Sequence, residues 1–318
     1  MRRPSPPRRA AHGATVENEP RLEYTAGEKG NAIQISGAGM KKIESLPFVA
    51  QFVRLCSIGD AQGFHERNGG NLSYRMTADD VKAAKALLKG RKPGPWVDVD
   101  PKGDVAVPGL AGEWFLVTGS GKFFRNVAYD TEASVAICEL DGAGAHYRLR
   151  WGLRDGGRPT SEFSSHLMNL EAKDRASGGR VRVIYHAHPA SLIAMTFVVP
   201  LTARAWTRAL WNTMTECPVI FPEGVGVVKW MVPGGREIAV ATSKLMEKYN
   251  NVVWAHHGLF CAADTFDNAM GQMETIEKAA RIFMTVRASG MKPVSGITTA
   301  GYKAIGKAFG VAIPKEFL

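Results

Sequence analysis

The sequence predicts an α/β protein, a single-domain αβα sandwich in which helices flank a central sheet of mixed or antiparallel strands. Short apolar runs typical of strands alternate with longer segments whose apolar residues recur at helical spacing. Several predicted strands also follow one another closely, as hairpins do, rather than in a strict succession of strand, helix and parallel strand. With 318 residues, the chain is long enough to bury a full hydrophobic core.

Helices are expected where the apolar stripe is sustained, as it is at Leu46, Val49 and Phe52. Thr77 is a suitable N-cap for a second helix, over residues 78–89. The predicted helices cover residues 45–62, 78–89, 160–170 and beyond, 189–197, 203–215, 236–249, 265–288 and 298–309.

Strands are expected where short apolar or β-branched runs lie between turn residues. The predicted strands cover residues 72–75, 114–118, 133–140, 147–151, 181–188, 218–221, 226–230 and 252–256. Residues 90–112 are rich in proline and glycine, which predicts an excursion from the core.

The chain is expected to consist of a disordered extension, residues 1–39, and a catalytic domain, residues 40–318. The extension begins Arg-Arg-Pro-Ser-Pro-Pro-Arg-Arg and has no apolar periodicity or secretory apolar region. No apolar run approaches the ~20 residues that span a bilayer, so no membrane association is expected. The four cysteines form no CxxC pair, which is typical of reduced thiols in a cytoplasmic protein.

The formal charge of +10 raises the question of nucleic-acid binding. The basic residues are dispersed, however, and no nucleic-acid-binding motif accompanies them, so no nucleic-acid partner is expected. A net positive charge also suits an enzyme that attracts a small anionic substrate.

The most informative segment is Val183-Ile184-Tyr185-His186-Ala187-His188. Residues two apart in a strand point to the same face, so both imidazoles can reach one ion. The pair alone is half a site, and a chance His-x-His would make ordinary hydrogen bonds. Since catalytic zinc commonly has three protein ligands and one open position, a histidine of the segment Trp254-Ala255-His256-His257-Gly258, at the end of another apolar strand, favours a metal site.

Glu162 is the leading carboxylate, expected in the first turn of a helix, where a negative charge is favourable even without function. Near a metal it could instead move a proton at an acidified carbon. His166, one turn later, is expected to pack or form hydrogen bonds rather than bind metal.

Two glycine-rich segments, residues 68–71 and 118–122, are suited to hold a phosphate with backbone N–H groups, although each could be an ordinary turn. The second fails the nucleotide P-loop pattern. Leu116 stands where the first glycine belongs and Phe123 follows the lysine, so an NTPase is not expected.

Seven segments together resemble the class II aldolase/adducin family, in particular its rhamnulose-phosphate branch. In chain order they are HERNGGNLS (65–73), VTGSGKFFRN (117–126), PTSE (159–162), HAH (186–188), TEC (215–217), WMVPG (230–234) and HG (257–258). The likeness runs from about residue 45 to the C-terminus. It is poor over residues 77–112, which are treated as an atypical insertion, and the N-terminal extension is foreign to the family.

The resemblance implies a zinc-dependent lyase that cleaves a ketose 1-phosphate, L-rhamnulose 1-phosphate, to dihydroxyacetone phosphate and L-lactaldehyde through a metal-stabilised enediolate. It implies zinc, or another divalent metal, on His186, His188 and His257, with Glu162 as the acid/base. Glu216 would act on the aldehyde half from a neighbouring subunit of a homotetramer. The residues implied in phosphate and substrate binding are Asn68, Asn71, Ser120, Thr160 and Ser161.

Two alternatives stay open at this point. A sugar-phosphate 4-epimerase or another lyase of the same fold would use the same three histidines, and only its products would differ. A non-catalytic, adducin-like binding protein is disfavoured, because a retained open metal site beside a carboxylate has no structural purpose.

Overall fold

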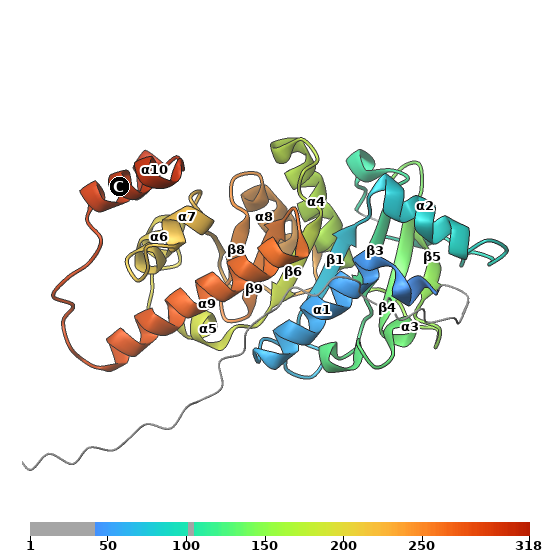
Figure 1. Cartoon of the computed structure of the whole chain (residues 1–318), viewed down its shortest axis with the longest axis horizontal. Helices are drawn as coiled ribbons and strands as arrows, with labels where there is room; N and C mark the ends of the chain where they lie inside the picture. The colour runs from blue at the N-terminus through green and yellow to red at the C-terminus, as the bar shows by residue number, and fades with distance from the viewer. Residues whose placement is uncertain (1–41, 101–104) are drawn as a thin grey trace, which may run out of the picture. The chain divides into compact units, whose positions relative to one another are not determined.

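The computed structural model describes residues 42–100 and 105–318, so the predicted disorder of residues 1–39 lies outside the described part of the chain. The strands are β1 (Asn71–Arg75), β2 (Val97–Asp98), β3 (Trp114–Thr118), β4 (Val135–Leu140), β5 (His146–Gly152), β6 (Val183–Ala187), β7 (Gly226–Val228), β8 (Asn251–Trp254) and β9 (Gly258–Ala263). They form one nine-stranded sheet in the order β2-β5-β4-β3-β1-β6-β9-β8-β7 (Figure 1). All neighbours are antiparallel except β7 and β8, which confirms the predicted mixed sheet.

Helices flank this sheet, and most of them match the predicted segments. Their bounds are α1 (Pro47–Ala61), α2 (Ala78–Leu87), α3 (Thr131–Ser134), α4 (Phe163–Ser177), α5 (Ala190–Met195), α6 (Ala203–Trp211), α7 (Cys217–Ile220), α8 (Arg236–Met246), α9 (Phe266–Ala288) and α10 (Thr299–Phe309). The expected cap of α2 is confirmed, since the Thr77 hydroxyl accepts the Asp80 N–H and the Asp80 carboxylate accepts the Thr77 N–H.

The two faces of the sheet can be followed along β6, whose successive side chains point to opposite sides. Tyr185 faces α1, where only a glycine, Gly59, fits against its hydroxyl. His186 faces the other side, where Phe260 stacks on it and also contacts His166 of α4. Helices α1 and α9 pack together on the first side, and α4 and α8 on the second. The sheet therefore has a helical layer on each face, as the fold prediction requires.

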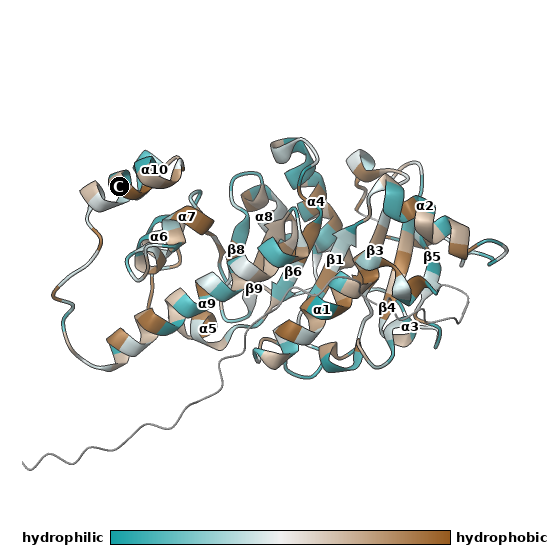
Figure 2. Ribbon diagram, in the orientation of Figure 1, coloured by the Kyte–Doolittle hydropathy of each residue, from teal (hydrophilic) through white to brown (hydrophobic). Residues whose placement is uncertain are grey.

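The hydrophobic core lies along the centre of the sheet. Every residue of β3 is buried, and this strand and β4 are among the most hydrophobic segments in Figure 2. The cysteines Cys56, Cys138, Cys217 and Cys261 are all buried and unpaired. Among the described residues, no helix is long and apolar enough to span a membrane.

Three local predictions were wrong. Residues 218–221 were expected to form a strand but belong to α7, where Pro218 occupies the first turn, a position that needs no N–H donor. Strand β9 was not predicted, because its hairpin with β8 has no Asn-Gly or similar turn signal. Helix α4 begins at Phe163 rather than near Thr160, so Glu162 is its N-cap residue and not a first-turn residue.

Residues 90–112 were expected to form an excursion from the core. Part of this segment packs against the core instead. Strand β2 extends the edge of the sheet beside β5, and the side chains of Val107 and Leu110 are fully buried. Within its described part, this segment therefore covers the β2–β5 edge of the sheet.

Candidate active site

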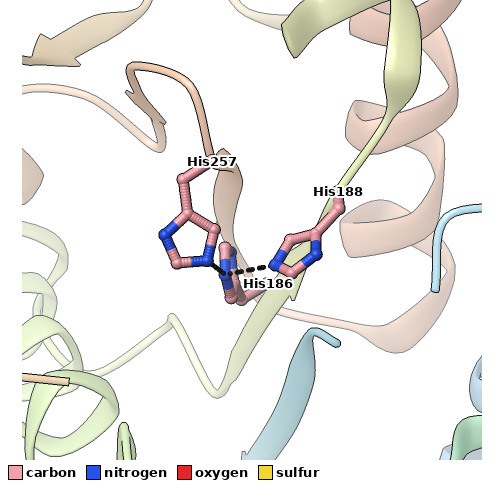
Figure 3. Close-up of side chains that lie close together, drawn as sticks. All are labelled: His186, His188 and His257. Carbon is pink, nitrogen blue, oxygen red and sulfur yellow. Dashed lines mark hydrogen bonds between the residues drawn. The ribbon is translucent and has the colours of Figure 1, made fainter. Parts of the chain in front are cut away.

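The three predicted metal-binding histidines converge beside the C-terminal end of strand β6 (Figure 3). His186 is the second-last residue of β6 and His188 directly follows the strand, while His257 lies in the turn between β8 and β9. The Nε2 atom of His186 is 3.3 Å from Nε2 of His188 and 3.3 Å from Nε2 of His257. Because β6 pairs directly with β9, residues about 70 apart in the sequence meet in this cluster.

The turn between β8 and β9 places His257, and not the adjacent His256, beside His186 and His188. His256 adopts a left-handed backbone conformation, with φ 59°, and its ring bonds to the Thr196 hydroxyl at 3.0 Å, away from the cluster. A side chain at Gly258 would collide with the carbonyl oxygen of Ala187. These two features fix which histidine joins the cluster, a choice that the sequence alone left to the family pattern.

Outer hydrogen bonds set the protonation of the cluster. Nδ1–H of His186 donates to the Leu259 carbonyl at 3.1 Å, and Nδ1–H of His188 donates to the Glu66 carboxylate at 2.7 Å. Burial, followed by the neighbouring histidines, holds the pKa of His186 well below its usual range, so the ring is neutral. Burial also lowers the pKa of His257 to about 4. Each of these rings therefore has an unprotonated nitrogen available for metal binding at neutral pH.

This donor set fits a divalent metal. When the two rings are neutral, the outer hydrogen bonds of His186 and His188 place the ring proton on Nδ1, so two Nε2 lone pairs face each other across 3.3 Å. Such an arrangement is repulsive unless a cation lies between the nitrogens. Carboxylate–histidine pairs such as Glu66 and His188 are typical of metal sites, where the outer carboxylate orients the ligand.

Glu162 lies beside the histidines, with Oε2 3.7 Å from Nε2 of His186. It is buried, and its Oε2 accepts a hydrogen bond of 2.7 Å from the Asn71 side-chain amide. Burial raises the pKa of Glu162, whereas the hydrogen bond from Asn71 acts in the opposite direction. A carboxylate with a raised pKa next to a metal site is suited to take up and return a proton.

A cavity of about 210 Å³ joins the histidines, Glu162 and the glycine-rich segments. Its lining includes all five residues predicted to bind phosphate or substrate, which are Asn68, Asn71, Ser120, Thr160 and Ser161. Gly70, with φ 74°, cannot be replaced easily, since a Cβ there would lie 2.7 Å from the His186 carbonyl oxygen. Three sequence segments about 40 residues apart thus meet around one polar cavity.

Glu216 is the predicted site residue that does not belong to this cavity. It is exposed at the start of α7 and is absent from the cavity lining of the described chain. Pro233 and Gly234 line the cavity without having been assigned a role, although they lie in one of the motifs quoted above. Glu66 was also missed, because nothing in sequence spacing indicates which carboxylate reaches the far nitrogen of His188.

Comparison with known proteins agrees with this geometry. The model of the Class II Aldolase and Adducin N-terminal domain matches residues 50–284. The rhamnulose-1-phosphate aldolase of Pectobacterium atrosepticum is 42% identical over 272 residues, which cover 86% of this chain and 97% of that protein. The same enzyme from one strain of Klebsiella pneumoniae is 39% identical over 273 residues, with 86% and 96% coverage.

Solved structures with the same fold include a sugar-phosphate aldolase from Thermotoga maritima, with a TM-score of 0.62, 24% identity, and coverage of 77% of this chain and 97% of that one. An L-fuculose 1-phosphate aldolase has a TM-score of 0.52 and 19% identity, with 82% and 95% coverage. At these identities the likeness concerns the fold alone. Together with the family match and the two sequence relatives, it shows that this chain belongs to the class II aldolase and adducin family and is a rhamnulose-1-phosphate aldolase-like class II aldolase.

Proposed function

We propose that this protein cleaves L-rhamnulose 1-phosphate to dihydroxyacetone phosphate and L-lactaldehyde in a metal-dependent retro-aldol reaction. The observation that carries the proposal is the convergence of His186, His188 and His257 beside Glu162 in a cavity that also contains the glycine-rich segments. The identity of 42% to an enzyme named for this substrate, over 97% of that enzyme, supports the choice of sugar.

In this proposal the phosphate binds on the glycine-rich side of the cavity. Asn68, Asn71, Ser120, Thr160 and Ser161 all line that side, and each offers a hydrogen-bond donor. The backbone N–H groups of Gly70 and Gly121, which donate to no other group among the described residues, add donors that cost no side-chain ordering. This arrangement holds the ketose by its phosphate and directs the ketone toward the three histidines.

The three histidines would hold a divalent metal, which we propose to be zinc because three imidazoles with one open position are typical of catalytic zinc. When bound, the metal supplies Lewis acidity that stabilises negative charge on the ketone oxygen. Glu162, in its protonated form, would then give its proton to the carbon beside the ketone after the carbon–carbon bond breaks, and would regain a proton from solvent before the next turnover. Glu216 would handle the hydroxyl proton of the aldehyde half from a neighbouring subunit.

That role for Glu216 requires an oligomer, and we propose a homotetramer. In support, the chain exposes large apolar side chains near the cavity wall, including Trp230, 62% exposed, and Val232, 69% exposed, just before Pro233. Light scattering after size-exclusion chromatography gives the mass that tests this. The four buried, unpaired cysteines support a reducing compartment, the cytoplasm.

A coupled retro-aldol assay tests the function. Purified protein is mixed with L-rhamnulose 1-phosphate, and released dihydroxyacetone phosphate is measured through NADH oxidation, with and without a chelator. Release that the chelator abolishes, and that added zinc restores, is the expected result. An epimerised sugar phosphate without release, or full activity in the metal-free protein, would contradict the proposal.

A further inference from the structure

A buried chain of hydrogen bonds runs from the centre of the sheet to Glu162. Ser73 Oγ lies 2.7 Å from Nδ1 of His166, and Nε2 of His166 bonds to Oδ1 of Asn71. The other end of the Asn71 amide, Nδ2, donates to Glu162 Oε2 at 2.7 Å. Ser73 and His166 are entirely shielded from solvent, and Asn71 is 5% exposed. We call this set of four residues the Ser73–Glu162 chain.

Elementary chemistry fixes the direction of every bond in this chain. An ionised Glu162 can only accept, so Asn71 must present its NH₂ group to it and its oxygen to His166. That oxygen can only accept, so His166 must carry its proton on Nε2. Its Nδ1 is then an acceptor, and the Ser73 hydroxyl must donate to it.

The surroundings of His166 hold it in this one state. The ring is completely buried and meets Phe260 edge to face, at a centroid distance of 5.6 Å. Burial lowers the pKa of His166 to about 3, so the ring stays neutral at physiological pH. Phe260 also stacks on His186, at a centroid distance of 4.1 Å, so its ring contacts both His166 and a member of the histidine cluster.

We infer that His166 is a positioning residue for the reaction, which fixes the orientation of the Asn71 amide and thereby holds the Glu162 carboxyl group in place. The inference rests on the proposed function, because it takes Glu162 as the acid/base. Without His166, the Asn71 amide could rotate and direct its oxygen at the Glu162 carboxylate, which would repel it. The chain also links a residue of the phosphate side, Asn71, to the carboxylate that moves the proton.

One test does not depend on activity. In protein labelled with ¹⁵N-histidine, long-range ¹H–¹⁵N correlation NMR distinguishes the two neutral tautomers by the shifts of their ring nitrogens. His166, identified by its loss in His166→Gln, is expected as the Nε2–H tautomer across pH 6 to 8, a range near the ordinary pKa of histidine, about 6.5. A protonated ring or an Nδ1–H tautomer would overturn the inference.

A second test measures proton transfer alone. Exchange of a hydrogen on the carbon beside the ketone of dihydroxyacetone phosphate with D₂O requires the acid/base but no aldehyde. In His166→Leu, the exchange rate at saturation should fall about 10- to 100-fold, as is common when an outer partner of a site is lost, with KM and bound zinc unchanged. His166→Gln, which can donate to Asn71 and accept from Ser73, should recover most of the rate.

A matched pair of serine variants controls for general loss of a buried hydroxyl. Ser73→Ala removes a member of the chain and should slow exchange several-fold. Ser165→Ala removes a neighbouring buried hydroxyl of α4 that has no hydrogen-bond partner among the described residues, and should leave exchange unchanged. Equal effects of the two variants, or an undiminished rate in folded His166→Leu, would refute the positioning role. If wild-type protein itself fails to exchange, the proposed function fails instead, while the tautomer still reports on the chain.

Discussion

The two sides of the cavity are built in different ways. The metal side consists of His186, His188 and His257, which are side chains at the ends of adjacent strands with few conformations open to them. The phosphate side consists of glycine-rich turns, residues 68–71 and 119–121 with Thr160 and Ser161, which present backbone groups and short side chains. Rigid placement suits a metal, which needs its ligands within tenths of an ångström, whereas a phosphate accepts donors from many directions. Substitutions on the metal side should therefore reduce activity and stability more than substitutions on the phosphate side.

The largest effect is expected for His188→Ala. This variant removes one of three converging ligands, so it should lose both bound metal and turnover. Metal content by mass spectrometry and the coupled aldolase assay measure the two losses.

His256→Ala is the matched control. It removes a histidine only one residue from the cluster, but one that bonds to Thr196 instead. It should retain metal and most activity, and a loss equal to that of His188→Ala would mean that the cluster is assigned to the wrong histidine.

The next largest effect is expected for Gly258→Ala. The added methyl group collides with the Ala187 carbonyl and crowds the rings of His186 and His188. Such overpacking should lower the free energy of unfolding by about 3 kcal/mol and weaken metal binding. Denaturant unfolding measures it, with Gly142→Ala as the control, because nothing lies within 4 Å of a Cβ at that position. Equal free energies of unfolding for Gly258→Ala and Gly142→Ala would contradict the conclusion that the metal side is rigid.

A smaller effect is expected on the phosphate side, for Ser120→Ala. Loss of one hydrogen bond to a charged phosphate should raise KM about 10-fold, because several other donors remain. Both kcat and bound metal should stay near their wild-type values. A fall in kcat with unchanged KM would place Ser120 in the chemistry instead of in phosphate binding.

The smallest effect concerns the pH dependence of stability in the metal-free protein. Burial raises the pKa of Glu162 in the folded state above its unfolded value, so the folded protein holds this proton more tightly. The free energy of unfolding therefore falls as the pH rises from the pKa of Glu162 in the unfolded state through its pKa in the folded state. Glu162→Gln should remove this loss, so the variant should gain stability over the wild type as pH rises through that window. Thermal unfolding at several pH values measures it, and parallel curves for the two proteins would refute the assignment.

The sequence predicted that His186 and His188 lie together, because the two-residue period of a strand places them on one face without further information. It also predicted most helices, where apolar spacing and caps such as Thr77 agree. It failed where local signals were weak. The turn before β9 has a histidine, not a glycine, at its left-handed position, and Pro218 lies in a helix among residues typical of strands.

What the sequence could not predict depends on pairing between distant segments. The hydrogen bonds of His166 require α4 to place this residue against β1, since both of its partners, Asn71 and Ser73, belong to that strand. The contact of Glu66 with His188 joins residues 122 apart. The sequence around His166 and Glu66 does not indicate these contacts, because buried histidines and exposed glutamates occur throughout folded proteins.

The register of β1 against β6, with Asn71 opposite His186, also limits how this sequence can change over time. Substitutions in β1 alter one contact each. An insertion or deletion of a single residue there would reverse the side to which its residues point and would remove Asn71 from Glu162 and Ser73 from His166 in one step. Changes of length are instead expected beside β2, which pairs with β5 at the outer edge of the sheet, four strands from β1 in the sheet order. The length of the chain can vary there while β1 and the site keep their alignment.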